Sequence, residues 1–286
     1  MIKPYIIIDN TKIKINNSTC IINNKSTKVN NISVNISVYL DSLCNAKCKF
    51  CCATKDYIAD FNFNKFENIL REIKNNSYTI NRIIFTGGEP LLNKNLFNAM
   101  YIAKQYTNEL VLNTNGFIYP NNKCIDLVDV INMSIHHYDN NINNDIFGLN
   151  KDINIFNKWL DYKNKIIPTC VLMKSYINKE DDIINYLDYI DSKGFKKAAF
   201  YGLMRINDYT KDEYIDINNI KFNNKYIINN KRICYPIKNI CQCNNYCYTS
   251  KINNIIPFYI RQVINHNYDK GNFILFKNNQ IISKFK

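Results

Sequence analysis

The chain has 286 residues, of which 46% are hydrophobic, and it carries a formal net charge of +13 at pH 7. This length allows one large domain with its own core, and no apolar run is long enough to predict a membrane span or a signal peptide, which favours a cytoplasmic protein without membrane contacts. A basic excess often indicates a nucleic-acid partner, but only five of the 37 basic residues are arginine, the better reader of phosphates and bases. Nucleic acid is therefore disfavoured as a partner.

Secondary-structure patterns divide the chain into three parts. Short β-branched runs and asparagine-rich turns over residues 5–30 predict an N-terminal β appendage, residues 1–32. In residues 33–204, buried-strand patterns alternate with helical patterns. The expected helices start at Asn64, Asn95 and Asn178, and the expected strands are Ser33–Leu40, Arg82–Thr86, Leu110–Thr114, Val128–Ile135, Ile166–Met173 and Lys197–Leu203. Residues 205–286 form the expected C-terminal extension, which contains cysteines and ends in short strands.

The alternation of strands and helices predicts an α/β fold with a parallel sheet and right-handed crossovers. Six strand–helix units indicate a partial (β/α)6 barrel of the TIM-like type, and not a closed barrel of eight units. Ligands of such a sheet gather at the carboxyl ends of the strands, so the loops that follow the strands should carry the chemistry.

Three cysteines follow the first expected strand, at Cys44, Cys48 and Cys51, with Phe50 directly before the last of them. The chain has eleven cysteines, an odd number, and no secretion signal, which favours reduced thiols over a disulfide framework. Three thiolates are one too few for a closed structural zinc site, but they can hold three irons of a 4Fe-4S cluster and leave the fourth iron open. The spacing therefore predicts an iron–sulfur site with an open iron. Cys52 lies outside this spacing.

The loop after the second expected strand has the sequence Thr86-Gly87-Gly88-Glu89-Pro90. Glycines permit close approach to the backbone, and a carboxylate suits an ammonium group. Together with the CxxxCxxC pattern, this loop resembles the glycine-rich motif of the radical S-adenosylmethionine (SAM) superfamily. The resemblance covers about residues 33–204, and it implies that SAM chelates the open iron and that an electron from the cluster cleaves SAM to a 5'-deoxyadenosyl radical.

The resemblance also implies a SAM site formed by the loops after successive strands. Asn113-Thr114-Asn115-Gly116 matches a pattern common in the superfamily, and Ser134 ends the fourth expected strand, from which a polar residue often reaches SAM. The SAM contacts that the resemblance implies are Phe50, Gly87, Gly88, Glu89, Asn113, Asn115, Ser134 and Val171. A reductant such as flavodoxin or ferredoxin is the implied redox partner.

A second cysteine group lies in the C-terminal extension. Four thiols fall within fourteen residues, at Cys234, Cys241, Cys243 and Cys247. They are enough for a second iron–sulfur cluster or a zinc ion. Their spacing departs from the pattern of the SPASM and twitch extensions of peptide- and sugar-modifying radical SAM enzymes, so unligated cysteines are the alternative.

The substrate is less constrained than the radical chemistry. His136 and His137 follow the fourth expected strand and are candidates for a proton donor or a polar anchor, with a structural role as the alternative. A ribosomal peptide or another natural-product precursor is the favoured substrate, because the chain is larger than a minimal barrel and has a second cysteine group. A glycyl-radical-enzyme activase and a nucleotide-modifying enzyme are alternatives. An iron–sulfur electron carrier is the non-enzyme alternative, and it would have no use for the loop Thr86–Pro90.

Overall fold

The computed structural model describes residues 5–8, 11–14, 18–22, 25–28, 33–53, 60–119, 122–149, 153–222, 226–236, 243–250, 256–263 and 273–282. The helices are α1 (Phe63–Asn75), α2 (Leu96–Lys104), α3 (Asn122–Leu127), α4 (Asn140–Phe147), α5 (Glu180–Ser192) and α6 (Asp208–Asp212), and the short 3-10 helices are η1 (Pro90–Leu92), η2 (Ile153–Tyr162) and η3 (Ile217–Asn219). The strands are β1 (Tyr5–Ile8), β2 (Thr11–Lys14), β3 (Ser18–Ile22), β4 (Lys25–Lys28), β5 (Ser33–Tyr39), β6 (Thr79–Thr86), β7 (Thr107–Thr114), β8 (Val130–Ser134), β9 (Ile166–Leu172), β10 (Ala198–Gly202), β11 (Tyr226–Pro236), β12 (Cys243–Ser250), β13 (Phe258–Val263), β14 (Phe273–Lys277) and β15 (Gln280–Ile282).

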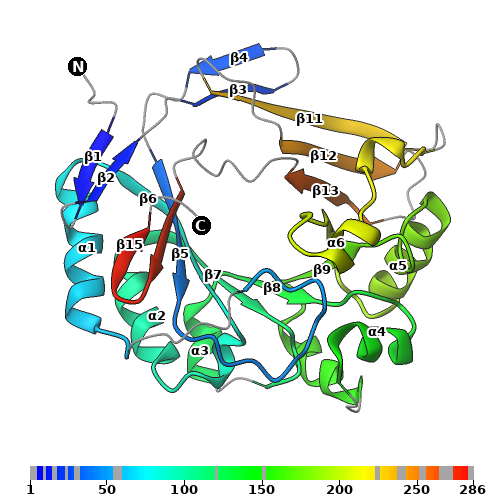
Figure 1. The fold of residues 1–286 in the computed structure, drawn as a ribbon, viewed down its shortest axis with the longest axis horizontal. Coiled ribbons are helices and arrows are strands. Elements are labelled where there is room, and N and C mark those ends of the chain that lie inside the picture. The colour runs from blue at the N-terminus through cyan, green and yellow to red at the C-terminus, as the bar shows by residue number, and fades with distance from the viewer. Residues whose placement is uncertain are drawn as a thin grey trace.

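A curved parallel sheet forms the centre of the fold (Figure 1). Strands β5 to β10 lie side by side in chain order, and each pairs with the next in parallel. Helices α1 to α5 cover the outer face of this curve. The sheet ends in β15 at one edge and β4 at the other, so it does not close. The expected α/β fold with a partial TIM-like barrel is confirmed.

The C-terminal strands lie on both flanks of the six barrel strands. Strand β14 pairs with β5 in parallel, and β13 pairs with β10 in parallel. Beyond β13 the sheet continues through antiparallel β12 and β11 to β3 and β4, whereas β1 and β2 form a separate hairpin. The strands expected as terminal appendages therefore extend the central sheet, and the division into residues 1–32, 33–204 and 205–286 stays a prediction.

Helix α1 shows how the sequence encodes the outer layer. Its buried side chains recur at helical spacing and face the sheet; they are Phe66, Ile69, Leu70 and Ile73. The observed cap is Asn62, two residues before the expected Asn64, because the side chain of Asn62 accepts a hydrogen bond from the backbone N–H of Lys65. The backbone N–H of Asn62 in turn donates to Oδ1 of Asn279 at 2.7 Å, a tertiary contact that local sequence cannot reveal.

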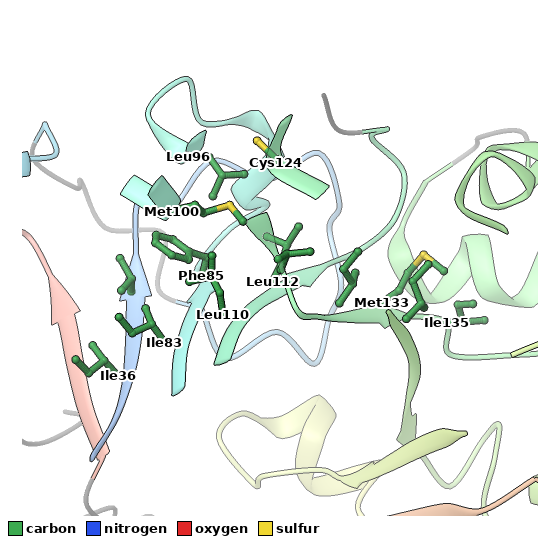
Figure 2. Packing of buried hydrophobic residues seen from close by; sticks show 14 of the residues in the cluster. Ile36, Ile83, Phe85, Leu96, Met100, Leu110, Leu112, Cys124, Met133 and Ile135 are labelled. Carbon is green, nitrogen blue, oxygen red and sulfur yellow. The ribbon is translucent and has the colours of Figure 1, made fainter. Parts of the chain in front are cut away.

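The core lies between the sheet and the outer helices (Figure 2). Alternate strand residues such as Ile83, Phe85 and Leu112 are fully buried against helices, whereas Arg82 and Ile84 are half-buried on the inner face of the curve. Met100 and Leu96 of α2 fill the space behind these strands. In the described parts of the chain, no helix is long and apolar enough to span a membrane. This packing holds the carboxyl ends of β5 to β10 in one row.

Candidate functional site

The cysteine loop leaves the carboxyl end of β5 and is held by its neighbours. The backbone N–H groups of Gly88 and Glu89 donate to the carbonyls of Asp41 and Leu43, at 3.0 and 2.7 Å. The N–H of Lys47 donates to the carbonyl of Phe147 at the end of α4, at 2.8 Å. The loops after β5 and β6 are therefore joined by main-chain hydrogen bonds, and α4 supports the far side of the cysteine loop.

The two glycines of the second loop are required by this close approach. A Cβ at Gly88 would lie 2.1 Å from the carbonyl oxygen of Leu43, far inside van der Waals contact. Gly87 has φ +126, a conformation that side chains rarely adopt, and a Cβ there would lie 2.7 Å from the carbonyl oxygen of Asp41. Only glycine at both positions lets the cysteine loop dock in this way.

Glu89 fastens the same loop to the end of β7. Its carboxylate accepts hydrogen bonds from the hydroxyl of Thr114 and the backbone N–H of Asn115, both at 2.8 Å, and from the N–H of Leu91 at 3.1 Å. Burial raises the pKa of this carboxyl above its ordinary value, and the three hydrogen bonds oppose that rise. Glu89 is 2% exposed. Its expected contact with SAM stays a prediction.

A row of side-chain amides crosses the inner face behind these loops. The amide of Asn113 donates to the hydroxyl of Thr86 at 3.3 Å, and it accepts from the amide of Asn132 at 2.9 Å. These three half-buried residues belong to β6, β7 and β8. The row presents hydrogen-bonding groups where an apolar barrel interior would present none.

The three thiols lie on one loop, and two of them act on the pKa of the third. Burial is the main cause that raises the pKa of the Cys48 thiol to about 12, and the charges of Cys51 and Cys44 raise it further. Cys44 and Cys51 are exposed. Among the residues that the structure describes, no three His, Cys, Asp or Glu side chains are already arranged to hold a metal ion. Three cysteine sulfurs on a single loop are nevertheless the donor set that suits an iron–sulfur cluster, and binding must displace the proton of Cys48.

His136 packs against Phe50, the aromatic residue of the cysteine loop. Its ring contacts Phe50 edge-on, with centroids 5.0 Å apart, and packs against Phe147 at 4.8 Å. Its Nδ1 accepts a hydrogen bond from the backbone N–H of Val171 at 3.3 Å, which places the ring proton on Nε2. The buried Asn143 accepts from the His136 N–H at 2.7 Å. His136 thus joins three elements next to the expected adenine contacts.

A small apolar cluster, separate from the main core, adjoins His136. Ile146, Met173 and Leu203 are its buried members, and Phe50 and Val171 pack against them. Ser134 ends β8 on the inner face and is paired in register with Thr169 of β9. The structure therefore places all eight expected SAM contacts in the loops or strand ends at one edge of the sheet.

Comparison with known proteins identifies the family. The sequence profile of the Radical SAM superfamily matches residues 41–219. The chain belongs to the radical SAM superfamily. This match begins directly after β5 and contains the cysteine loop, the Gly-Gly-Glu loop and the barrel strands β6 to β10.

Individual relatives of this radical SAM protein differ in function. The chain is 29% identical to MJ1632 of Methanocaldococcus jannaschii, assigned as a glycyl-radical enzyme activating enzyme, over 153 residues, 52% of each chain. It is 38% identical over 85 residues to YydG of Bacillus subtilis, assigned to peptide biosynthesis, which covers 29% of this chain and 26% of YydG. The crystal structure of Streptococcus suis SuiB with a precursor peptide has a TM-score of 0.53 at 18% identity, and covers 64% of this chain and 42% of SuiB. The chain thus spans about half or less of the length of each.

The side chains of all four cysteines of the second group lie outside the part of the chain that the structure describes. Cys241 is outside the described residues. Cys234 belongs to β11, where it is paired in register with Cys20 of β3, and Cys243 and Cys247 belong to β12. Strands β11 and β12 pair antiparallel. The auxiliary metal site of this radical SAM protein stays a prediction.

Two residues that support the candidate site, Asn207 and Asn143, belong to no motif that the sequence reveals. The amide of Asn207, which caps α6, donates to the carbonyl of Lys49 in the cysteine loop at 3.2 Å. Asn143 accepts hydrogen bonds from the N–H groups of both His136 and His137. A polar residue on the buried face of α4 is the only cue that could have indicated Asn143. Helix α6 is too short for a helical pattern to predict.

The burial of His136 predicts an acid-sensitive fold. Burial lowers the pKa of His136 to about 3 from its ordinary value of 6.5, so the unfolded chain binds this proton at a higher pH than the folded chain. The stability that this residue contributes is present above pH 6.5 and is lost as the pH falls towards 3. At pH 5 the expected loss in the free energy of unfolding is ~2 kcal/mol. This value also means that His136 is neutral at pH 7 and can donate only through Nε2–H.

Urea unfolding at pH 7 and pH 5 measures this effect. In His136→Asn, which keeps a side-chain acceptor for the Val171 N–H, the pH 5 loss should shrink by about the same ~2 kcal/mol. Equal losses in the wild type and the variant would show that His136 does not carry the acid sensitivity.

Proposed function

We propose that this chain reductively cleaves SAM at a 4Fe-4S cluster bound by Cys44, Cys48 and Cys51, and that it removes a hydrogen atom from a peptide. The observation that carries the proposal is the direct docking of the cysteine loop on the Gly-Gly-Glu loop, through the 2.7 Å hydrogen bond from Glu89 to Leu43. A bound cluster would supply the electron that breaks the sulfonium bond of SAM, and a flavodoxin or ferredoxin would then reduce the cluster again. The reducing conditions that such a site needs agree with a cytoplasmic location.

In this proposal each group of residues handles one part of SAM. The backbone of Gly87 and Gly88, with the carboxylate of Glu89, binds the amino group, since a buried carboxylate favours an ammonium. Asn113 and Ser134 reach the ribose or the carboxylate from the inner face. Phe50 and Val171 hold the adenine against the apolar cluster, which excludes water from the reacting atoms.

The inner face supports a peptide as the substrate. Hydrogen-bonding side chains line it, including the amide row of Asn113 and Asn132 and the phenols of Tyr201 and Tyr259, whose oxygens lie 3.2 Å apart. Such donors and acceptors suit the amide groups of a peptide backbone. Among the relatives, YydG is assigned to peptide biosynthesis. The chain also resembles MJ1632, so activation of a glycyl-radical enzyme is the second candidate.

Formation of 5'-deoxyadenosine tests the proposal. Anaerobically reconstituted protein with SAM and a reductant should release 5'-deoxyadenosine and methionine, and the absence of both would contradict it. Adding a short peptide encoded beside the gene should increase the yield if the substrate is a peptide. An increase on adding a glycyl-radical enzyme instead would favour the activase.

A further inference from the structure

The side-chain amide of Asn115 is fully engaged by the cysteine loop and its own turn. Its Nδ2 donates to Oδ1 of Asn45 at 2.7 Å and to the sulfur of Cys44 at 3.9 Å, within reach for a large sulfur acceptor. Its Oδ1 accepts from the backbone N–H of Phe117 at 3.0 Å. An amide nitrogen has two protons. Both acceptors of this nitrogen therefore lie inside the cysteine loop, the amide oxygen of Asn45 and the sulfur of Cys44.

The turn that carries Asn115 is held rigidly. The backbone N–H of Asn115 donates to the buried carboxylate of Glu89 at 2.8 Å. Trp159, fully buried, donates its indole N–H to the carbonyl of Gly116 at 2.9 Å. Gly116 has φ +76, and a Cβ there would lie 2.8 Å from the sulfur of Met133, so this turn requires glycine. Asn115 itself is 8% exposed, which fixes the direction of its amide.

Cys44 is the cysteine of the loop whose sulfur accepts hydrogen bonds from two N–H donors. The backbone N–H of Ala46 points at its sulfur at 3.4 Å, and the amide of Asn115 approaches the same atom. One donor comes from the cysteine loop and the other from the end of β7. Hydrogen bonds to the ligand sulfurs are among the features that set the reduction potential of iron–sulfur clusters.

We infer that Asn115 is a positioning residue of the cluster site, which anchors Cys44 and raises the reduction potential of the bound cluster through its N–H···S contact. The inference rests on the proposed function, since it needs Cys44 as a ligand. A donor to sulfur stabilises the more negative, reduced cluster more than the oxidised one. Because both acceptors of its amide nitrogen lie in the cysteine loop, Asn115 acts on the cluster and leaves the direct SAM contacts to the other residues of the set.

Potentiometric titration of the reconstituted cluster without SAM tests the inference. In Asn115→Leu, which keeps the branched arrangement of side-chain heavy atoms and lacks the donors, the ratio of reduced to oxidised cluster at a fixed potential should fall about tenfold, a shift of ~59 mV for a one-electron couple. Asn115→Asp keeps an acceptor for Phe117 if the leucine variant fails to fold. Iron per chain, measured before the titration, shows that each variant is loaded.

A matched variant separates the hydrogen bond from charge. Nδ2 of Asn45 is buried and has no hydrogen-bond partner among the described groups, so Asn45→Asp breaks no bond there and leaves Asn115 as the donor. Asn115→Asp and Asn45→Asp each add one carboxylate beside the cluster. The potential should be lower in Asn115→Asp than in Asn45→Asp, and equal values would overturn the inference. If the wild type binds no iron–sulfur cluster, both the proposed function and this inference fail. If the wild type binds the cluster and Asn115→Leu has the same reduction potential, only the inference fails.

Discussion

Gly88→Ala should prevent the protein from holding an iron–sulfur cluster. The new methyl group would lie 2.1 Å from the carbonyl oxygen of Leu43 and 2.6 Å from its carbonyl carbon. These are backbone atoms, so no change of side-chain rotamer relieves the clash, and the cysteine loop must move away from β6. The expected cost is about 3 kcal/mol of stability, the upper end for overpacking. Iron per chain after anaerobic reconstitution, together with urea unfolding, measures both effects.

Gly194→Ala is the matched control for this substitution. Gly194 has a positive φ of +83, which Gly88 lacks, and the nearest atom to its Cβ position is the flexible end of Lys163 at 3.2 Å. It follows α5, far along the chain from the cysteine loop. We expect a loss of about 1 kcal/mol from the strained conformation and an unchanged iron content. If Gly88→Ala binds as much iron as Gly194→Ala, the contact between the two loops is not needed for the cluster.

Cys48→Ala should reduce 5'-deoxyadenosine formation to the level seen without enzyme. Removal of one of the three proposed sulfur ligands would leave a 4Fe-4S cluster with only two protein ligands on this loop. The half-buried Cys48 also packs against the main core, so iron content and the far-ultraviolet circular dichroism spectrum are needed to separate ligand loss from misfolding. The release of 5'-deoxyadenosine per unit time is the primary measurement.

Cys52→Ala provides the control within the same loop. Cys52 follows Cys51 directly and is exposed, but it falls outside the CxxxCxxC spacing. We expect its variant to bind iron and to cleave SAM as the wild type does. A Cys48→Ala protein that is as active as the wild type, or a Cys52→Ala protein that is inactive, would show that the assigned set of cysteines is wrong.

The order of the barrel strands could be predicted because it is encoded locally. Apolar strand runs such as Ile83–Phe85 are followed by turn signals such as Gly87-Gly88, and amphipathic stretches such as Phe66–Ile73 lie between the strands. The partners of the terminal strands could not be predicted. β14 pairs with β5, which precedes it by more than two hundred residues, and the contact between Asn62 and Asn279 has the same long range. Such pairings depend on the assembled sheet and leave no local pattern.

The candidate site was predictable as motifs but not as contacts. The cysteine spacing and the Gly-Gly-Glu loop were evident in the sequence, since they depend on residue types at fixed intervals. The partners of Glu89 were not, because its carboxylate meets Thr114 and Asn115 only after β6 and β7 pair. The same holds for His136, whose neutral state follows from burial between Phe50 and Phe147.

Electron paramagnetic resonance of the reduced, reconstituted protein, before and after addition of SAM, tests the central claim most directly. The account predicts the spectrum of a reduced 4Fe-4S cluster that changes when SAM is added, because three cysteines leave one iron free for it. Cys48→Ala should give neither the cluster spectrum nor the change. A wild-type spectrum that SAM leaves unaltered, or a protein that takes up zinc in place of iron at Cys44, Cys48 and Cys51, would contradict the account.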